Sequence, residues 1–259
     1  MFHRLLAFVL AAFLALPLLG GCVRSELTGR QQLLILPPSS EQEMGLTAWQ
    51  ELLKKHKINR DPRINTMVQR VLGRIAGATG QTGYNWEFAV IEDRTPNAFA
   101  LPGGKVGVHT GILPYTRDET GLAAVIGHEV AHVIARHGGE RVSQQLLVNL
   151  GLAAVEAGMS GGDPAMVRQV TGLLGAGASV GLILPFSRSH ESEADRLGLI
   201  YMAKAGYDPR AAVDFWRRMQ QAGRGKGKPP EFLSTHPSDE TRIRQLQQWL
   251  PEAMRHYRP

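Results

Sequence analysis

Apolar residues recur at helical spacing in several stretches of the chain. After Asp61-Pro62, a pair that favours a helix start, they follow at intervals of three and four residues: Ile64, Met67, Val68, Val71, Leu72 and Ile75. Ser40 and Glu43 form a capping box that predicts another helix, ending near residue 56. Similar patterns predict helices over residues 119–136, 141–158, 164–174, 187–205, 209–222 and 238–249.

A short region between these helices has the pattern of β-strands. Apolar residues alternate with polar or small ones from Trp86 to Val90, and segments 98–101 and 106–108 flank a glycine-rich turn. Helices therefore precede and follow a few strands, which is an α+β arrangement and not the alternation of a doubly wound fold. The predicted fold is mainly helical, with a small antiparallel sheet beside the helix of residues 119–136.

The N-terminus has the three parts of a secretory signal. Arg4 is followed by an apolar run from Leu5 to Leu19 and by small residues before Cys22. The sequence Leu19-Gly20-Gly21-Cys22 resembles a bacterial lipobox, in which the cysteine is lipidated and becomes the first residue of the mature chain. The alternative is an ordinary signal peptide with an incidental cysteine.

This reading divides the chain into three parts. We expect a signal peptide over residues 1–21, a lipid-anchored tether over 22–38 and a single domain over 39–259. Val23 after the cysteine favours the outer membrane of a Gram-negative bacterium, with the domain at its periplasmic face.

Composition and charge exclude some kinds of cross-link, metal site and partner. The chain is 43% hydrophobic and 20% charged, which is typical of a globular protein. Its single cysteine excludes an internal disulfide and a zinc site with two or more thiolates. The formal net charge is +6, but the basic residues are scattered, so we expect no nucleic-acid partner.

The sequence His128-Glu129-Val130-Ala131-His132 carries the clearest chemistry. On a helix, residues four apart share a face, so both imidazoles can reach one zinc ion, and Glu129 can take a proton from a zinc-bound water. The alternative is a solvated pair of histidines, but the apolar flanks favour zinc. Ala135 and Gly138 stand where a metzincin would have Gly and His, so that class is excluded.

A second group of candidate residues lies further along the chain. Glu191 and Asp195 are four apart, which suits a ligand carboxylate and an aspartate that orients a ligand histidine. His190 is a competing ligand candidate. Glu193 is expected to be a surface carboxylate, and His137 a solvated or capping histidine.

Four ordered motifs over residues 97–242 resemble a known family. They are Asn97-Ala98-Phe99-Ala100-Leu101-Pro102-Gly103-Gly104, the His128–His132 motif, Glu191 with Ala194-Asp195, and Thr235-His236-Pro237 with Arg242. The family is that of the gluzincin zinc peptidases, which include HtpX, BepA, the CAAX prenyl protease and the Oma-type protease. With no membrane span after its signal and a short C-terminal end, the chain is most similar to the family's small periplasmic lipoproteins.

The resemblance implies a role for each matching residue. His128, His132 and Glu191 would ligate one zinc ion, with a zinc-bound water as the nucleophile and Glu129 as the general base. Asp195 would orient a ligand. His236 would either stabilise the oxyanion or close the site as a further ligand.

Two further roles rest on weaker signals. Arg242 would hold the His236 loop or a substrate carbonyl. The strand of Asn97, Ala98, Phe99 and Ala100 would bind an extended substrate by strand addition, unless it is already paired on both sides.

The resulting hypothesis is a zinc endopeptidase that cleaves misfolded or misassembled cell-envelope proteins and reaches the membrane through the lipid on Cys22. The alternative is an outer-membrane assembly chaperone or binding lipoprotein with a closed or vestigial zinc site. Residues 146–184, apolar and rich in glycine, would form either a mobile cover or a packed helix.

Overall fold

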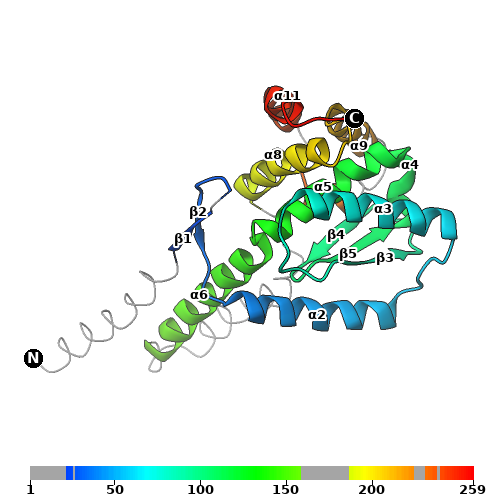
Figure 1. Cartoon of the computed structure of the whole chain (residues 1–259). Coiled ribbons are helices and arrows are strands. Elements are labelled where there is room, and N and C mark those ends of the chain that lie inside the picture. The colour runs from blue at the N-terminus through cyan, green and yellow to red at the C-terminus, as the bar shows by residue number, and fades with distance from the viewer. Residues whose placement is uncertain (1–21, 26, 159–186, 225–230, 238–239) are drawn as a thin grey trace, which may run out of the picture. The chain divides into compact units, whose positions relative to one another are not determined.

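The computed structural model describes residues 22–25, 27–158, 187–224, 231–237 and 240–259, which form two compact units (Figure 1). The described part of the first unit comprises residues 22–25, 27–38 and 139–158, and the second unit comprises the rest. The expected signal peptide, the helix over 164–174 and most of the expected cover lie outside the described residues. The predicted domain boundaries stay a prediction.

The first unit combines a hairpin with a long helix. Strands β1 (Cys22–Arg24) and β2 (Gln31–Leu33) pair in antiparallel fashion, and α6 (His137–Gly158) supplies the helix from Gly139 onward. The Arg30 guanidinium forms an ion pair with Glu140 at 2.6 Å, and the Ile35 amide donates to the Ser143 hydroxyl.

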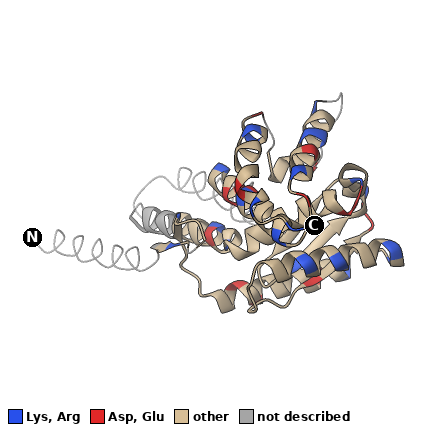
Figure 2. Ribbon diagram, turned by 45° about the horizontal axis from the view of Figure 1, so that its top comes forward, with Lys and Arg blue, Asp and Glu red and all other residues tan. Residues whose placement is uncertain are grey.

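The second unit contains most of the helices. They are α2 (Pro38–Lys55), α3 (Pro62–Ala78), α4 (Leu113–Thr116), α5 (Glu119–Ile134), α8 (Arg188–Lys204), α9 (Arg210–Gly223), α10 (Glu231–Thr235) and α11 (Glu240–Met254), with the 3-10 turn η1 (Thr110–Ile112). The predicted helices are confirmed where the structure describes them, with ends that differ by a few residues. The short helices α4 and α10 were not predicted. Lys and Arg lie on several of the helices, interspersed with Asp and Glu (Figure 2).

The second unit also holds a three-stranded sheet, in which β5 (Lys105–His109) lies between β3 (Glu87–Ile91) and β4 (Ala98–Leu101). β5 is antiparallel to β4 but parallel to β3, so the prediction of an antiparallel sheet was wrong for this pair. The reason is that β4 lies at the edge of the sheet away from β3. The chain then turns back through a hairpin, so that β5 enters between β3 and β4 and runs in the direction of β3. All five residues of β5 are buried.

Helix α5 runs through the core of the second unit. It packs against α3 and β4 on one side and against α8 and α9 on another, while α2 lies on the opposite side of the sheet (Figure 1). Its residues Gly121–Val133 are all buried, which explains their nearly uninterrupted apolar sequence. Among the residues that the structure describes, no helix has the length and apolar character needed to cross a membrane.

Candidate metal centre

Two crossing helices carry most of the candidate site residues. The N-terminus of α5 is set by Asp118, whose carboxylate accepts the Gly121 amide at 2.8 Å. Ser187 caps α8 in the same way, accepting the amide of His190. These caps set where each helix begins and thus which residues face the neighbouring helix.

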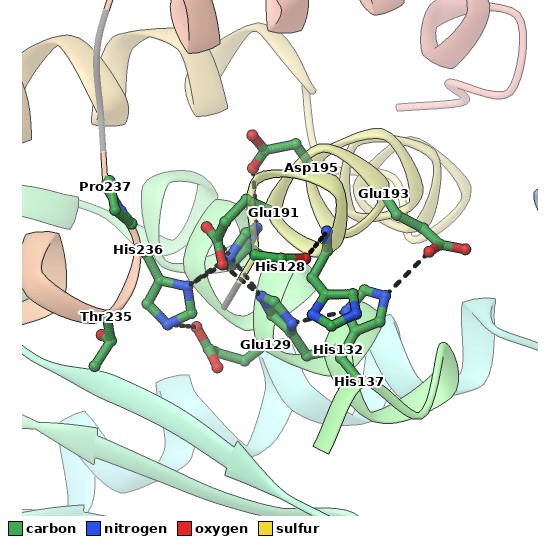
Figure 3. A network of polar contacts seen from close by, with 12 residues as sticks. His128, Glu129, His132, His137, Glu191, Glu193, Asp195, Thr235, His236 and Pro237 are labelled. Carbon is green, nitrogen blue, oxygen red and sulfur yellow. Dashed lines mark hydrogen bonds and ion pairs between the residues drawn. The ribbon is translucent and has the colours of Figure 1, made fainter. Parts of the chain in front are cut away.

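Three histidines and one carboxylate converge in the interior of the second unit (Figure 3). The Nε2 atoms of His128 and His132 lie 3.0 Å apart, and Nδ1 of His236 lies 3.1 Å from Nε2 of His128. Glu191 Oε1 is 2.9 Å from His236 Nδ1 and 3.3 Å from His132 Nε2. One ligand atom from each of the four residues falls within 4.8 Å of all the others.

These separations fit a zinc ion. Zn–N and Zn–O bonds of about 2.0–2.1 Å in a tetrahedron place neighbouring ligand atoms about 3.3–3.4 Å apart. The separations of 2.9–3.3 Å quoted above are close to that value. A cation between the four ligand atoms would offset the repulsion between their lone pairs.

The charges around His128 and Glu191 support the same conclusion. Burial lowers the pKa of His128, but the carboxylates of Glu191 and Asp195 outweigh it and raise that pKa to about 9. Burial raises the pKa of Glu191, yet His236, Arg242 and His128 hold it well below the ordinary value. The site is therefore a place where positive charge is stabilised.

His132 differs from His128 in this respect. Burial is the largest cause that holds its pKa well below the ordinary value, and the neighbouring His128 and His137 act in the same direction. A neutral imidazole with a free Nε2 lone pair is the form that binds a metal ion.

Asp195 and Arg242 form a buried support beneath the ligands. Asp195 Oδ1 lies 2.9 Å from Nδ1 of His128, and both of its oxygens accept from the Arg242 guanidinium at 2.7 Å. Arg242 also lies 2.8 Å from Glu191 Oε2 and is stacked over the Trp216 ring at 3.4 Å. The predicted place of Asp195 beside a ligand histidine is thus found in the structure.

The His236 loop is tied to this support. Arg242 Nη1 donates to the carbonyl of Pro237 at 2.9 Å, and the Phe232 ring packs against the imidazole of His236. Of the two roles expected for His236, the geometry corresponds to the further ligand, because Nδ1 faces the other ligand atoms. Of the two roles expected for Arg242, the geometry corresponds to holding the His236 loop, because Arg242 donates to the Pro237 carbonyl.

Glu129 lies beside the ligand atoms and is 2% exposed. Its Oε2 accepts the Ala100 amide at 3.2 Å, while its buried Oε1 makes no hydrogen bond and lies 3.3 Å from His236 Nε2. Burial raises the pKa of this carboxyl, although His236 and His128 oppose the shift. The raised pKa suits a group that accepts and returns a proton.

The expected substrate strand is the edge strand β4. Its order in the sheet leaves one side unpaired by any described strand, and the Ala100 amide points from that side to Glu129. Asn97 faces the other way, since its carbonyl accepts the amide of His109. Among the described strands, β4 is therefore paired on one side only, and the alternative of pairing on both sides is not found.

His137 and Glu193 are placed differently from the expectation. His137 is 0% exposed and not solvated, and Glu193 is buried and not a surface carboxylate. Helix α5 ends at Ile134, and Arg136 adopts a left-handed conformation with φ of 56°, which turns His137 back beneath His132. The prediction continued the helix to residue 136 and so placed His137 on another face. His190 is buried too, but it does not belong to the group of four.

The comparisons with known proteins agree with this geometry. The model of peptidase family M48 matches residues 59–250. The chain is 43% identical over 218 residues to the mitochondrial metalloendopeptidase OMA1 of Schizosaccharomyces pombe, with 82% of this chain and 62% of the relative covered. It is 32% identical over 245 residues to human OMA1, with 89% and 46% covered.

A bacterial relative gives the same result. The beta-barrel assembly-enhancing protease of Yersinia pestis is 31% identical over 195 residues, with 71% of this chain and 38% of the relative covered. The chain thus spans less than two thirds of the length of these relatives. Because the family match includes the two ligand helices and the His236 loop, the chain belongs to peptidase family M48.

Proposed function

We propose that this protein is a zinc-dependent endopeptidase. The observation that carries the proposal is the position of Glu129, whose unbonded carboxylate oxygen lies next to four converging ligand atoms. His128, His132, Glu191 and His236 would hold the metal ion. M48 peptidases use zinc, and the two-nitrogen, one-carboxylate core with a further imidazole is a donor set that zinc accepts.

The residues around the site suit hydrolysis of a peptide bond. A zinc ion held there would polarise the peptide carbonyl and lower the pKa of a water molecule. Glu129 would accept the proton of the attacking water and deliver it to the leaving amine, since its pKa is raised by burial. Asp195 and Arg242 would keep His128 and Glu191 oriented throughout, because both are locked by short ion pairs.

We further propose that His236 closes the site in the resting state. A catalytic zinc site needs one position free of protein ligands, whereas His236 would supply a fourth protein ligand here, because its Nδ1 lies 3.1 Å from His128 Nε2 and 2.9 Å from Glu191 Oε1. The His236 imidazole would have to move away before substrate binds. Pro237 and the short α10 next to it are the chain segments that would move.

The edge of β4 would bind the substrate. An extended peptide that adds to this edge would pair with the backbone of Ala98 and Ala100, next to Glu129. The amide of Ala100 would exchange its hydrogen bond to Glu129 for one to the peptide. Backbone pairing of this kind places few demands on the sequence, which suits unfolded polypeptides.

The cellular substrates and location are inferred from the N-terminus. We infer that the mature chain is anchored by lipid on Cys22 to the periplasmic face of the outer membrane and cleaves misfolded or misassembled envelope proteins. The name of the Yersinia pestis relative is compatible with this location. The OMA1 relatives are mitochondrial, so the location rests on the lipobox-like sequence alone.

The test is degradation of casein, an unfolded protein, by the purified full-length chain. We expect cleavage with zinc, none with a chelator, and a decrease of about 10²–10⁴-fold in Glu129→Gln, with zinc binding retained. The control is Glu51→Gln, because Glu51 is exposed and its substitution makes the same chemical change away from the site. Glu193 is not used as a control because it lies near the site. Full activity of Glu129→Gln would refute the proposed mechanism.

The closed ligand set also favours a second candidate function, a binding or assembly lipoprotein. The discriminating experiment is a cellular one. If cells that carry Glu129→Gln keep the wild-type phenotype, binding is the function. If they behave like cells without the protein, proteolysis is.

A further inference from the structure

A buried chain of polar contacts leads away from His132 on the side opposite the candidate metal centre (Figure 3). Nδ1 of His132 lies 2.9 Å from Nδ1 of His137, and Nε2 of His137 lies 3.1 Å from Oε2 of Glu193. All three side chains are buried. The residues come from α5, from the first turn of α6 and from α8.

The protons in this chain can be assigned if His132 binds metal. A ligand histidine presents a bare nitrogen to the ion, and here that nitrogen is Nε2, so Nδ1 must carry the proton. His132 Nδ1–H then donates to His137 Nδ1, which must be bare. His137 therefore carries its proton on Nε2 and donates it to the Glu193 carboxylate. Each of these two contacts then has one donor and one acceptor.

The Nδ1 atom of His128 also faces a hydrogen-bond acceptor, but without an intervening histidine. Its Nε2 faces the other ligand atoms, and its Nδ1 lies 2.9 Å from Oδ1 of Asp195. Each ligand histidine of α5 is thus linked to a carboxylate. His128 contacts Asp195 directly, and His132 is linked to Glu193 through His137. Both carboxylates belong to α8, two residues apart, so one helix orients both imidazoles.

The ring of His137 is held in place by more than these contacts. It stacks on the buried ring of His190, with centroids 4.5 Å apart and an interplanar angle of 23°. A stacked ring cannot rotate without displacing its neighbour, so Nδ1 of His137 stays directed at His132. Both ring nitrogens of His137 are hydrogen-bonded, as buried polar atoms need to be, so the ring is fixed by its contacts as well as by the stack.

We propose that His137, supported by Glu193, is a positioning residue that sets the tautomer and orientation of His132 for metal binding. The inference rests on the proposed metal centre. Its consequence is that loss of His137 weakens zinc binding even though His137 does not touch the ion. Replacement of orienting partners of ligand histidines lowers metal affinity by about 10–100-fold.

The experiment measures zinc affinity of the full-length chain by competition with a chromophoric chelator. His137→Leu removes the acceptor and is expected to weaken zinc binding by about 10–100-fold. His137→Asn places an amide oxygen near the position of Nδ1 and should restore most of the affinity. Glu193→Gln keeps an acceptor for His137 and should show a smaller loss than His137→Leu.

Tyr201→Phe is the matched control. Tyr201 lies on α8, is buried, and its hydroxyl makes no hydrogen bond, so its removal perturbs the same helix without touching the contacts of His132. Its zinc affinity is expected to equal that of the wild type. If His137→Leu binds zinc as tightly as Tyr201→Phe does, the inference is wrong.

A second measurement covers the case in which His137→Leu does not fold. Long-range proton–nitrogen NMR of the zinc-loaded wild type reports which ring nitrogen carries the proton. We expect the Nδ1–H form for His132 and the Nε2–H form for His137, and an Nδ1–H form of His137 would overturn the inference. A wild-type chain that binds no zinc would instead refute the proposed function.

Discussion

Gly127 of α5 and Gly198 of α8 face each other where the two ligand-bearing helices cross. A Cβ atom on Gly198 would lie 3.1 Å from the backbone carbon of Gly127 and equally close to the amide nitrogen of His128. The two backbones can approach this closely only because neither residue has a side chain. This contact lets Glu191 and Asp195 of one helix reach His128 and His132 of the other.

Gly198→Ala is therefore expected to weaken both folding and zinc binding. The added methyl group must push α8 away from α5, and such overpacking typically costs about 1–3 kcal/mol. Urea unfolding and chelator competition measure the two effects. Gly73→Ala is the control, because Gly73 is exposed on α3 with open space around it, and it should stabilise the chain by about 0.5–1 kcal/mol. Equal effects of the two substitutions would contradict the argument.

His236→Ala is expected to activate the enzyme. If the closed arrangement of His236 is about tenfold more populated than the open one, only a small fraction of the molecules can bind substrate. Removal of the imidazole should then raise the rate of casein cleavage by about tenfold. Zinc should also bind less tightly, because one of four ligands is lost. The exposed His256→Ala serves as the control. A fall in the cleavage rate, with zinc still bound, would show that His236 takes part in the reaction itself.

Arg242→Met should be the most destabilising of these changes. Arg242 is buried and pairs with both Asp195 and Glu191, so its loss removes the guanidinium counter-charge from two buried carboxylates. Breaking a buried ion pair from one side costs about 3–5 kcal/mol. Denaturant unfolding of the chelator-treated chain measures this free energy without contributions from metal.

Arg217→Met provides the comparison for this prediction. Arg217 is exposed, and its ion pair with Asp214 on the same helix spans 3.4 Å. We expect a change within about 0.5 kcal/mol. A loss at Arg242 as small as that at Arg217 would mean that the buried carboxylates are satisfied without the guanidinium.

The stability of the chain should depend on Glu119 in a defined pH range. Hydrogen bonds from Arg70 are the largest cause that lowers the pKa of Glu119 below the ordinary 4.5, burial opposes the shift, and the Tyr207 hydroxyl adds to the lowering. A carboxylate with a lowered pKa stabilises the folded state fully above its unfolded pKa. That stabilisation is lost as the pH falls through the lower, folded value.

Glu119→Gln should reveal this dependence. The difference in unfolding free energy between wild type and variant is expected to stay constant down to about pH 4.5 and to shrink below it. Urea unfolding at a series of pH values measures the difference. A difference that stays constant over the acidic range would show that Glu119 does not bind Arg70 more tightly in its charged form.

Local patterns in the sequence were enough to identify the residues of α5 and α8 that face the candidate metal centre. Residues four apart on a helix share a face regardless of what surrounds it, so His128 with His132 and Glu191 with Asp195 could be recognised as pairs. The helices themselves follow from apolar periodicity and capping residues. His236 could be suspected only through its resemblance to the family motif.

The positions of His137, Glu193 and His236 depend on the tertiary structure. The left-handed turn at Arg136 brings His137 back under His132, and the crossing of α5 with α8 brings Glu193 to it. Likewise β5 is inserted between β3 and β4, which no strand pattern specifies. Periodicity describes which residues share a face of one element. The partner of that face depends on turns and helix crossings, which are set by the packing of distant segments.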